Sequence, residues 1–107
     1  MILHVSIEDK SYPIEVPEVL LHEAQDFFAR MNADMDQGWQ MGRYWVEAPD
    51  RQDRCRIVAE KLHGAIEGHN TQLVQLMGAY ILHTLPNTLG IRFAAGAEVQ
   101  DIELING

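Results

Sequence analysis

Two helical patterns joined by a very short link constrain the fold of this chain more than any other feature of its sequence. Apolar residues recur at steps of three and four over residues 55–66 and again over residues 73–81, as on the buried face of an amphipathic helix. Gly68 suits the end of the first helix and Asn70 the cap of the second, which leaves a connection of about three residues. So short a connection predicts an antiparallel helix pair.

An earlier segment predicts a third helix. Pro17 fits its first residue, where the missing N–H costs nothing, and apolar residues continue at helical spacing as far as Met35. The helix dipole disfavours acidic side chains in a last turn. We therefore expect the helix to end between Asn32 and Asp34, before Asp36.

Strict alternation of apolar and polar residues predicts a β-hairpin at the start of the chain. Residues 2–8 and 11–16 each alternate with period two, and the polar pair Asp9-Lys10 separates them. This pattern is typical of two antiparallel strands with one buried face. Pro13 cannot donate to a strand ladder, so it belongs on an edge strand or at the start of a strand.

The end of the chain is less periodic. Residues 91–95, between Gly90 and Gly96, suit either a short strand or a buried loop, and residues 99–105 suit a final strand. The predicted fold class is therefore α+β: an N-terminal β-hairpin plus a C-terminal strand form a small antiparallel sheet, packed on three helices. The chain has 107 residues and 47% apolar residues, which fits one domain over residues 1–107 with its own core.

The charge balance limits the classes of partner. Sixteen acidic residues against eight basic ones give a formal net charge of −8, which argues against binding nucleic acid or an anionic membrane. Cys55 is the only cysteine, so no intrachain disulfide forms and a reducing compartment is expected. The first residues show no signal-peptide pattern, and no apolar run has the length of a membrane span. We expect a cytoplasmic protein; the oligomeric state stays open.

The segment from Asp34 to Pro49 is the main candidate for a functional surface, because it holds both tryptophans and is long for a connection. Two glycines make a regular helix there unlikely. In an extended chain Arg43 would lie between the indoles of Trp39 and Trp45, which suits guanidinium–aromatic stacking. One side would carry Trp39, Met41, Arg43 and Trp45, and the other Gln40, Tyr44 and Val46.

Such a surface could bind an anionic or planar ligand, or side chains of a partner protein. Alternatively, the indoles complete the core while Arg43 pairs with Asp34 or Asp36. The candidate binding residues are Asp34, Asp36, Trp39, Arg43, Tyr44 and Trp45.

No motif predicts a metal or cofactor site. Asp34-x-Asp36-x-Gly38 matches the start of an EF-hand calcium loop, but the loop's sixth and twelfth positions, which need glycine and glutamate, are Trp39 and Trp45. The five histidines form no HxxxH or HExxH pair. We expect no cofactor, and no tight calcium or zinc site.

No catalytic residue is predicted. Cys55 lies between Arg54 and Arg56, which could lower the pKa of its thiol, but it also falls on the apolar stripe of its helix, and a buried structural thiol is the favoured interpretation. The chain has no phosphate-binding glycine loop, GxSxG elbow or dinucleotide fingerprint.

The strings Asp34-Met-Asp-Gln-Gly-Trp, Gly42-Arg-Tyr-Trp-Val and Arg54-Cys-Arg, with Pro49 between the last two, resemble a group of short proteobacterial proteins of uncharacterised function. The resemblance runs through most of the chain. It implies a bacterial cytoplasmic source and brings no activity with it.

Two hypotheses of function follow. The first is a non-enzymatic protein-interaction or accessory module that uses the aromatic and arginine-containing loop over residues 38–48. The alternative is a small-molecule or metal-binding domain, enzymatic or not, built around Arg43, Trp39, Asp34 and Asp36. An exposed apolar aromatic patch would favour the first, and a concave pocket with convergent polar groups the second.

Overall fold

The computed structural model describes residues 1–107 and confirms the predicted α+β class. The longer elements form around the predicted patterns, with two short strands and two single turns in addition. In chain order they are β1 (Ile2–Ile7), β2 (Lys10–Glu15), α1 (Leu20–Glu23), α2 (Gln25–Asp36), β3 (Trp39–Met41), β4 (Tyr44–Val46), α3 (Arg51–Glu67), α4 (Thr71–Thr84), β5 (Thr88–Phe93), the 3₁₀ turn η1 (Val99–Asp101) and β6 (Glu103–Asn106).

The main sheet has four strands in the order β2-β1-β5-β6. It is mixed rather than wholly antiparallel, because β5 returns from α4 and pairs parallel to β1. The predicted pairing of the C-terminal strand with the hairpin is wrong, since β6 pairs with β5. Gly90 suggested an interruption, yet it lies inside β5, where a Cβ would come within 2.6 Å of the carbonyl oxygen of His4. The close approach of two backbones explains this glycine.

The N-terminal hairpin forms as predicted, with its turn one residue earlier. Ile7 pairs with Lys10, so Glu8 and Asp9 make the turn, and Glu8 takes a left-handed conformation with φ +54°. Pro13 lies on the edge strand β2 opposite His4. Hydrogen bonds in both directions join the backbones of residues 1 and 16, and by alternation Pro13 falls at a pair whose backbone groups point away from β1.

The predicted end of α3 at Gly68 and the predicted cap of α4 at Asn70 are both confirmed. Asp50 caps α3 in a capping box with Asp53, and the Asn70 side chain accepts a hydrogen bond from the backbone N–H of Leu73. The earlier helix differs from the prediction at both ends and is interrupted. It begins at Leu20 rather than Pro17, it is interrupted at Ala24 (φ −95°, ψ 17°), so that α1 is a single turn, and α2 extends to Asp36 instead of ending by residue 34.

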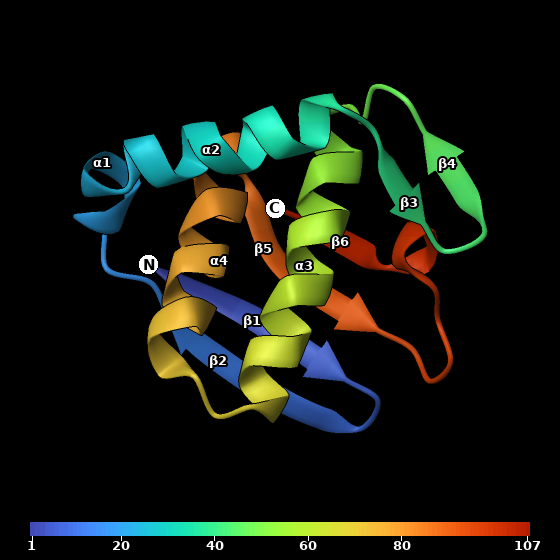
Figure 1. The fold of residues 1–107 in the computed structure, drawn as a ribbon. Coiled ribbons are helices and arrows are strands. Elements are labelled where there is room, and N and C mark those ends of the chain that lie inside the picture. The colour runs from blue at the N-terminus through green and yellow to red at the C-terminus, as the bar shows by residue number, and fades with distance from the viewer.

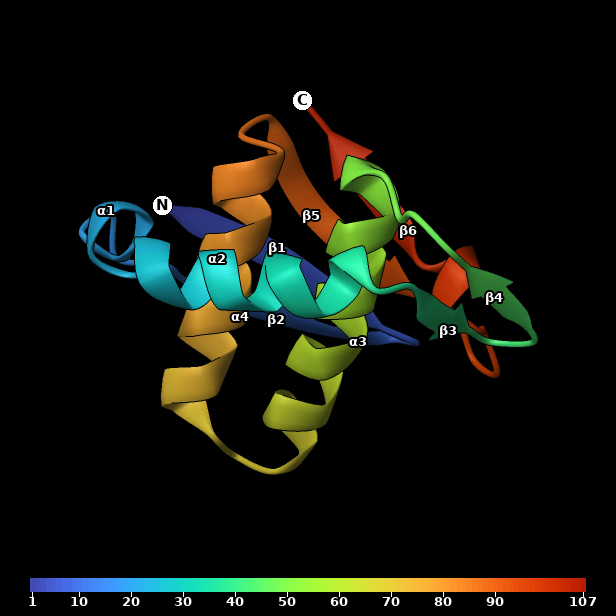
Figure 2. The ribbon, with the colours of Figure 1, turned by 45° about the horizontal axis from the view of Figure 1, so that its top comes forward.

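Figures 1 and 2 show the layers. Helices α3 and α4 run antiparallel across one face of the sheet, as predicted, and α2 crosses over them near one end, while the β3–β4 hairpin projects from the edge of the molecule. The core lies between the sheet and the helix pair, where side chains such as Val5, Ile91, Leu62 and Ile81 are fully buried. None of the helices combines the length and hydropathy needed to cross a membrane.

Candidate functional site

The segment predicted as a long loop is a two-stranded hairpin. Strands β3 and β4 pair antiparallel, with Met41 opposite Tyr44, so Gly42 and Arg43 form a two-residue turn. Gly42 has φ +60°, as a type II′ turn requires at this position. The turn reverses the chain and invalidates the predicted division of side chains between two sides. Cross-strand partners share a face, so Trp39 and Trp45 lie on opposite faces and Arg43 does not lie between them.

Two aromatic side chains of this hairpin are open to solvent, one on each face. Tyr44 is 65% exposed and Trp45 59% exposed. The indole of Trp45 lies against Gly38, which has φ +99° and where a Cβ would come within 2.5 Å of the ring. Trp39 is half-buried and Met41 buried, so strand β3 anchors the hairpin, while Tyr44 and Trp45 of β4 are exposed.

Arg43 lies at the tip of the hairpin and makes one weak ion pair. Its Nε is 3.5 Å from Oε1 of Glu98, and its side chain is 84% exposed. The adjoining Gly42 rests on the side chains of Glu98 and Gln100 in the 98–100 segment. The predicted pairing of Arg43 with Asp34 or Asp36 does not occur.

Asp36 belongs instead to a polar network that we name the Arg54 junction, consisting of Asn32, Asp36, Arg54 and Tyr80. The guanidinium of Arg54 pairs with the Asp36 carboxylate and donates to the backbone and side-chain oxygens of Asn32 and to the carbonyl of Pro49. The Tyr80 hydroxyl donates to Asn32 Oδ1 at 2.6 Å, and burial raises the pKa of Tyr80.

This junction explains why α2 is longer than predicted. Arg54 compensates the charge of Asp36 and contacts a carbonyl of the last turns of α2, at Asn32. A cation at a helix C-terminus opposes the dipole penalty that argued for an earlier end. The network therefore holds α2 against α3 and α4 and has a structural role.

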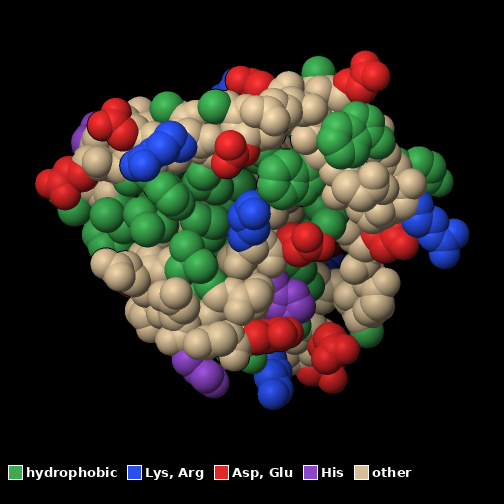
Figure 3. All heavy atoms as spheres, in the orientation of Figure 1, with side chains coloured by type: hydrophobic (Ala, Val, Ile, Leu, Met, Phe, Trp, Pro, Cys, Tyr) green, Lys and Arg blue, Asp and Glu red, His purple; other side chains and the backbone are tan.

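A second region between the same helices is open, and we name it the central groove. It lies among α2, α3 and α4, with a volume of about 610 Å³, and Figure 3 shows the apolar side chains that gather on this face of the molecule. Asp34, Lys61, Asn70 and two glycines complete its lining. The apolar residues that line it are Phe27, Met31, Met35, Trp39, Ala65, Leu73 and Met77.

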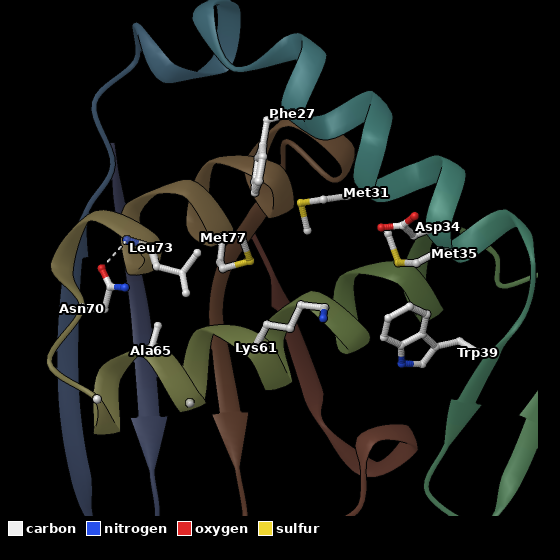
Figure 4. Close-up of a pocket in the computed structure, with 12 residues that line it drawn as sticks. Phe27, Met31, Asp34, Met35, Trp39, Lys61, Ala65, Asn70, Leu73 and Met77 are labelled. Atoms are coloured by element: carbon white, nitrogen blue, oxygen red, sulfur yellow. Dashed lines mark hydrogen bonds between the residues drawn. The ribbon is translucent and has the colours of Figure 1, made fainter.

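Two charged side chains lie in the central groove in different situations. The ammonium of Lys61 lies 4.9 Å from the centre of the Trp39 ring, a cation–π contact. Asp34 makes no ion pair, and Figure 4 shows its carboxylate on the α2 wall near Met35. Neither side chain has an ionic partner within the chain, so the Asp34 carboxylate is free to pair with a cation.

Gly64 is the least expected residue of the groove. It lies inside α3, and a Cβ built there would meet no atom within 4 Å. Glycine in a helix interior destabilises the helix by roughly 0.5–1 kcal/mol relative to alanine. In contrast, a Cβ at Gly78 in α4 would lie 3.0 Å from Val16, so the packing of the fold accounts for that glycine. Nothing within the chain accounts for Gly64.

The structure thus divides the six predicted site residues among three places. Asp34 and Trp39 meet in the central groove, and Arg43, Tyr44 and Trp45 lie on the hairpin. Asp36 lies in the Arg54 junction. Sequence reasoning missed the remaining groove residues, whose signal was a glycine within a helical pattern and methionines spaced along α2.

The other candidate chemistry does not form a site. No three His, Cys, Asp or Glu side chains come together in an arrangement that could hold a metal ion. The predicted absence of a tight calcium or zinc site stays a prediction. Cys55 is fully buried, and burial raises the pKa of its thiol to about 12 despite the opposing effect of Arg51 and Arg56. Such a thiol is not a nucleophile at neutral pH.

Comparison of the chain with protein-family models, with curated proteins and with solved structures found no match. The function is therefore argued from the geometry of the chain itself.

Proposed function

We propose that this protein is a non-enzymatic interaction module of the bacterial cytoplasm that binds an apolar segment of a partner protein in the central groove. The observation that carries the proposal is Gly64, which keeps part of the groove wall free of side chains at a cost to helix stability. A residue that lowers stability without serving the internal packing fits close approach by another molecule.

The hairpin extends this surface. Trp39 belongs to the 38–48 segment and forms part of the groove wall, so the predicted loop and the groove adjoin. Tyr44 and Trp45 follow on the same hairpin with most of their surface exposed. Tyrosine and tryptophan are the residues most often responsible for binding energy at protein interfaces. The proposed interface therefore runs from the groove onto the hairpin.

The test is affinity capture from a lysate of the source organism with three forms of the protein. Gly64→Leu adds a side chain to the groove wall at a position where the new Cβ meets no neighbouring atom. Gln52→Leu is the matched control, because it adds the same side chain to an exposed position of α3 outside the groove. We expect a protein that is captured by the wild type and by Gln52→Leu but lost with Gly64→Leu. Equal capture by all three forms would contradict the proposal.

A small amphipathic molecule is the second candidate occupant. The groove is concave and mainly apolar, and Asp34, Lys61 and Asn70 supply polar groups along it, a combination typical of ligand sites. Arg43 and Asp36, included in the sequence-based version of this hypothesis, do not line the groove. Native mass spectrometry of the purified protein tests it: a bound small molecule present in the wild type and absent from Gly64→Leu would favour this candidate.

A further inference from the structure

The walls of the central groove are formed mainly by helices, which limits what shape of segment fits there. Backbone groups near the groove are used within the helices; the N–H of Gly68, for example, donates to the carbonyl of Gly64. No strand of the main sheet lines the groove, and β3 contributes only Trp39. An extended segment would therefore find few backbone partners, whereas a helix satisfies its own backbone hydrogen bonds.

The apolar lining also suits a helix. Met31, Met35 and Met77 give the groove three flexible, polarisable side chains, which adapt to the apolar stripe of a docked helix. Figure 4 shows Met31 and Met77 between α2 and α4, Met35 further along α2 near Trp39, and Lys61 and Ala65 on the facing α3. Gly64 lies on the same helix one residue before Ala65 and leaves room for an anchoring side chain.

The charge of the whole chain, together with Asp34, favours a basic polar side for that helix. Lys61 makes a cation–π contact with Trp39 but no ion pair, and Asp34 has no partner of opposite charge. The whole chain carries a formal net charge of −8, which attracts cationic partners and repels anionic ones during encounter. A Lys or Arg beside the apolar stripe of the bound helix would pair with Asp34.

We infer that the occupant of the central groove is an amphipathic α-helix of a partner protein with basic residues flanking its apolar stripe. The inference rests on the proposed function and specifies its partner. The apolar stripe fills the space between α2 and α3 over Gly64, and a basic side chain of the helix pairs with Asp34.

The experiment uses two synthetic peptides of about 18 residues with blocked ends, long enough for partial helicity in isolation. Both carry leucine at helical spacing; the remaining positions are lysine in one peptide and glutamate in the other. Isothermal titration calorimetry against the wild type should give saturable binding of the lysine peptide and at least about tenfold weaker binding of the glutamate peptide.

Four variants locate the binding. Gly64→Leu should weaken binding of the lysine peptide by roughly tenfold or more, while Gln52→Leu leaves it unchanged. Asp34→Asn should weaken it roughly three- to fivefold. Asp26→Asn removes the same charge from an exposed position of α2 outside the groove, and should change the affinity less than about twofold.

Different failures have different meanings. Equal affinity for the two peptides, with both lost in Gly64→Leu, overturns the basic character of the partner and leaves the proposed groove function standing. Binding of the lysine peptide that survives in Gly64→Leu overturns the placement in the groove, because attraction to the acidic surface would then account for it. Absence of binding by either peptide overturns the helical occupant, while capture from lysate still decides the proposed function.

Discussion

The Arg54 junction and the central groove both lie where α2 meets the helix pair α3 and α4, yet the side chains of the junction are paired within the chain and those of the groove are not. Next to the junction, Phe28 is only 1% exposed and packs edge-to-face on Tyr80, with its ring also stacked on His83. In the groove, the adjacent Phe27 is only half-buried and Asp34 has no ionic partner.

The difference separates residues that stabilise the fold from residues that are available to bind another molecule. The junction uses its polar groups internally, and the hollow of about 570 Å³ that Asn32, Arg54 and Tyr80 line has a single hydrophobic residue in its walls. The groove retains apolar surface and a glycine where an added Cβ would meet no neighbouring atom. Substitutions in the first region should therefore act on stability, and substitutions in the second on binding.

Phe28 and Phe27 give the largest expected contrast, because neighbouring residues of the same type face the two regions. Phe28→Ala should lower the free energy of unfolding by about 3–5 kcal/mol, as truncation of a buried phenylalanine does. Phe27→Ala should cost less, about 1.5 kcal/mol, since its side chain is only half-buried. Leu62→Ala, which truncates a fully buried side chain of α3, should cost about 2–5 kcal/mol. Denaturant unfolding measures all three, and equal losses for the two phenylalanines would abolish the distinction.

Substitutions of Arg54 test how much the hydrogen bonds of the Arg54 junction stabilise the fold. Arg54→Ala should lower the free energy of unfolding by about 1.5–3 kcal/mol, because charged hydrogen bonds to Asn32 and Pro49 are lost together. Arg54→Lys keeps the charge but not the fork of donors, and should recover only part of this loss. Thermal and denaturant unfolding are the measurements. Full recovery by lysine would mean that charge alone, rather than the network, fastens α2.

Gly64 and Gly78 sharpen the comparison with effects of opposite sign. Gly64→Ala should raise the free energy of unfolding by about 0.5–1 kcal/mol, since alanine favours the helix and meets no neighbour. Gly78→Ala should lower it by about 1 kcal/mol or more, because the new Cβ would press on the buried Val16. Urea titrations of both variants would show this. If Gly64→Ala were destabilising, the glycine would be needed by the fold, and it would no longer support a binding role for the central groove.

Periodicity predicted the elements that bury a face of their own. The alternation of residues 2–16 and the stripes of α3 and α4 each describe a local unit packed on one core, and local signals such as Gly68 and Asn70 mark where α3 ends and α4 begins. The pairing of β5 could not be predicted in this way. Its position between β1 and β6 depends on the return of the chain across the sheet, and Gly90 within it weakened the strand pattern.

The central groove could not be predicted from the sequence for a related reason. Asp34 and Trp39 are predicted site residues, but the other residues of the groove come mainly from α3 and α4. Only the crossing of α2 over that helix pair brings them together. Asp36, two positions from Asp34, turns instead to Arg54. Spacing along the chain placed both acids on one segment and could not tell which side of α2 each would face.

Substitution of Arg43 has the smallest expected effect on stability, and it tests whether the hairpin belongs to the same binding surface as the central groove. Its guanidinium is mostly exposed and its contact with Glu98 is 3.5 Å long, so Arg43→Ala should change the free energy of unfolding by less than about 0.5 kcal/mol. A change that leaves stability intact but weakens capture of the groove's partner would show that the interface extends along β3 and β4 to this tip. Unfolding and capture measured on the same preparation separate the two outcomes. A loss of several kcal/mol would instead mean that the hairpin depends on this ion pair, and would assign Arg43 to the fold in the same way as Arg54.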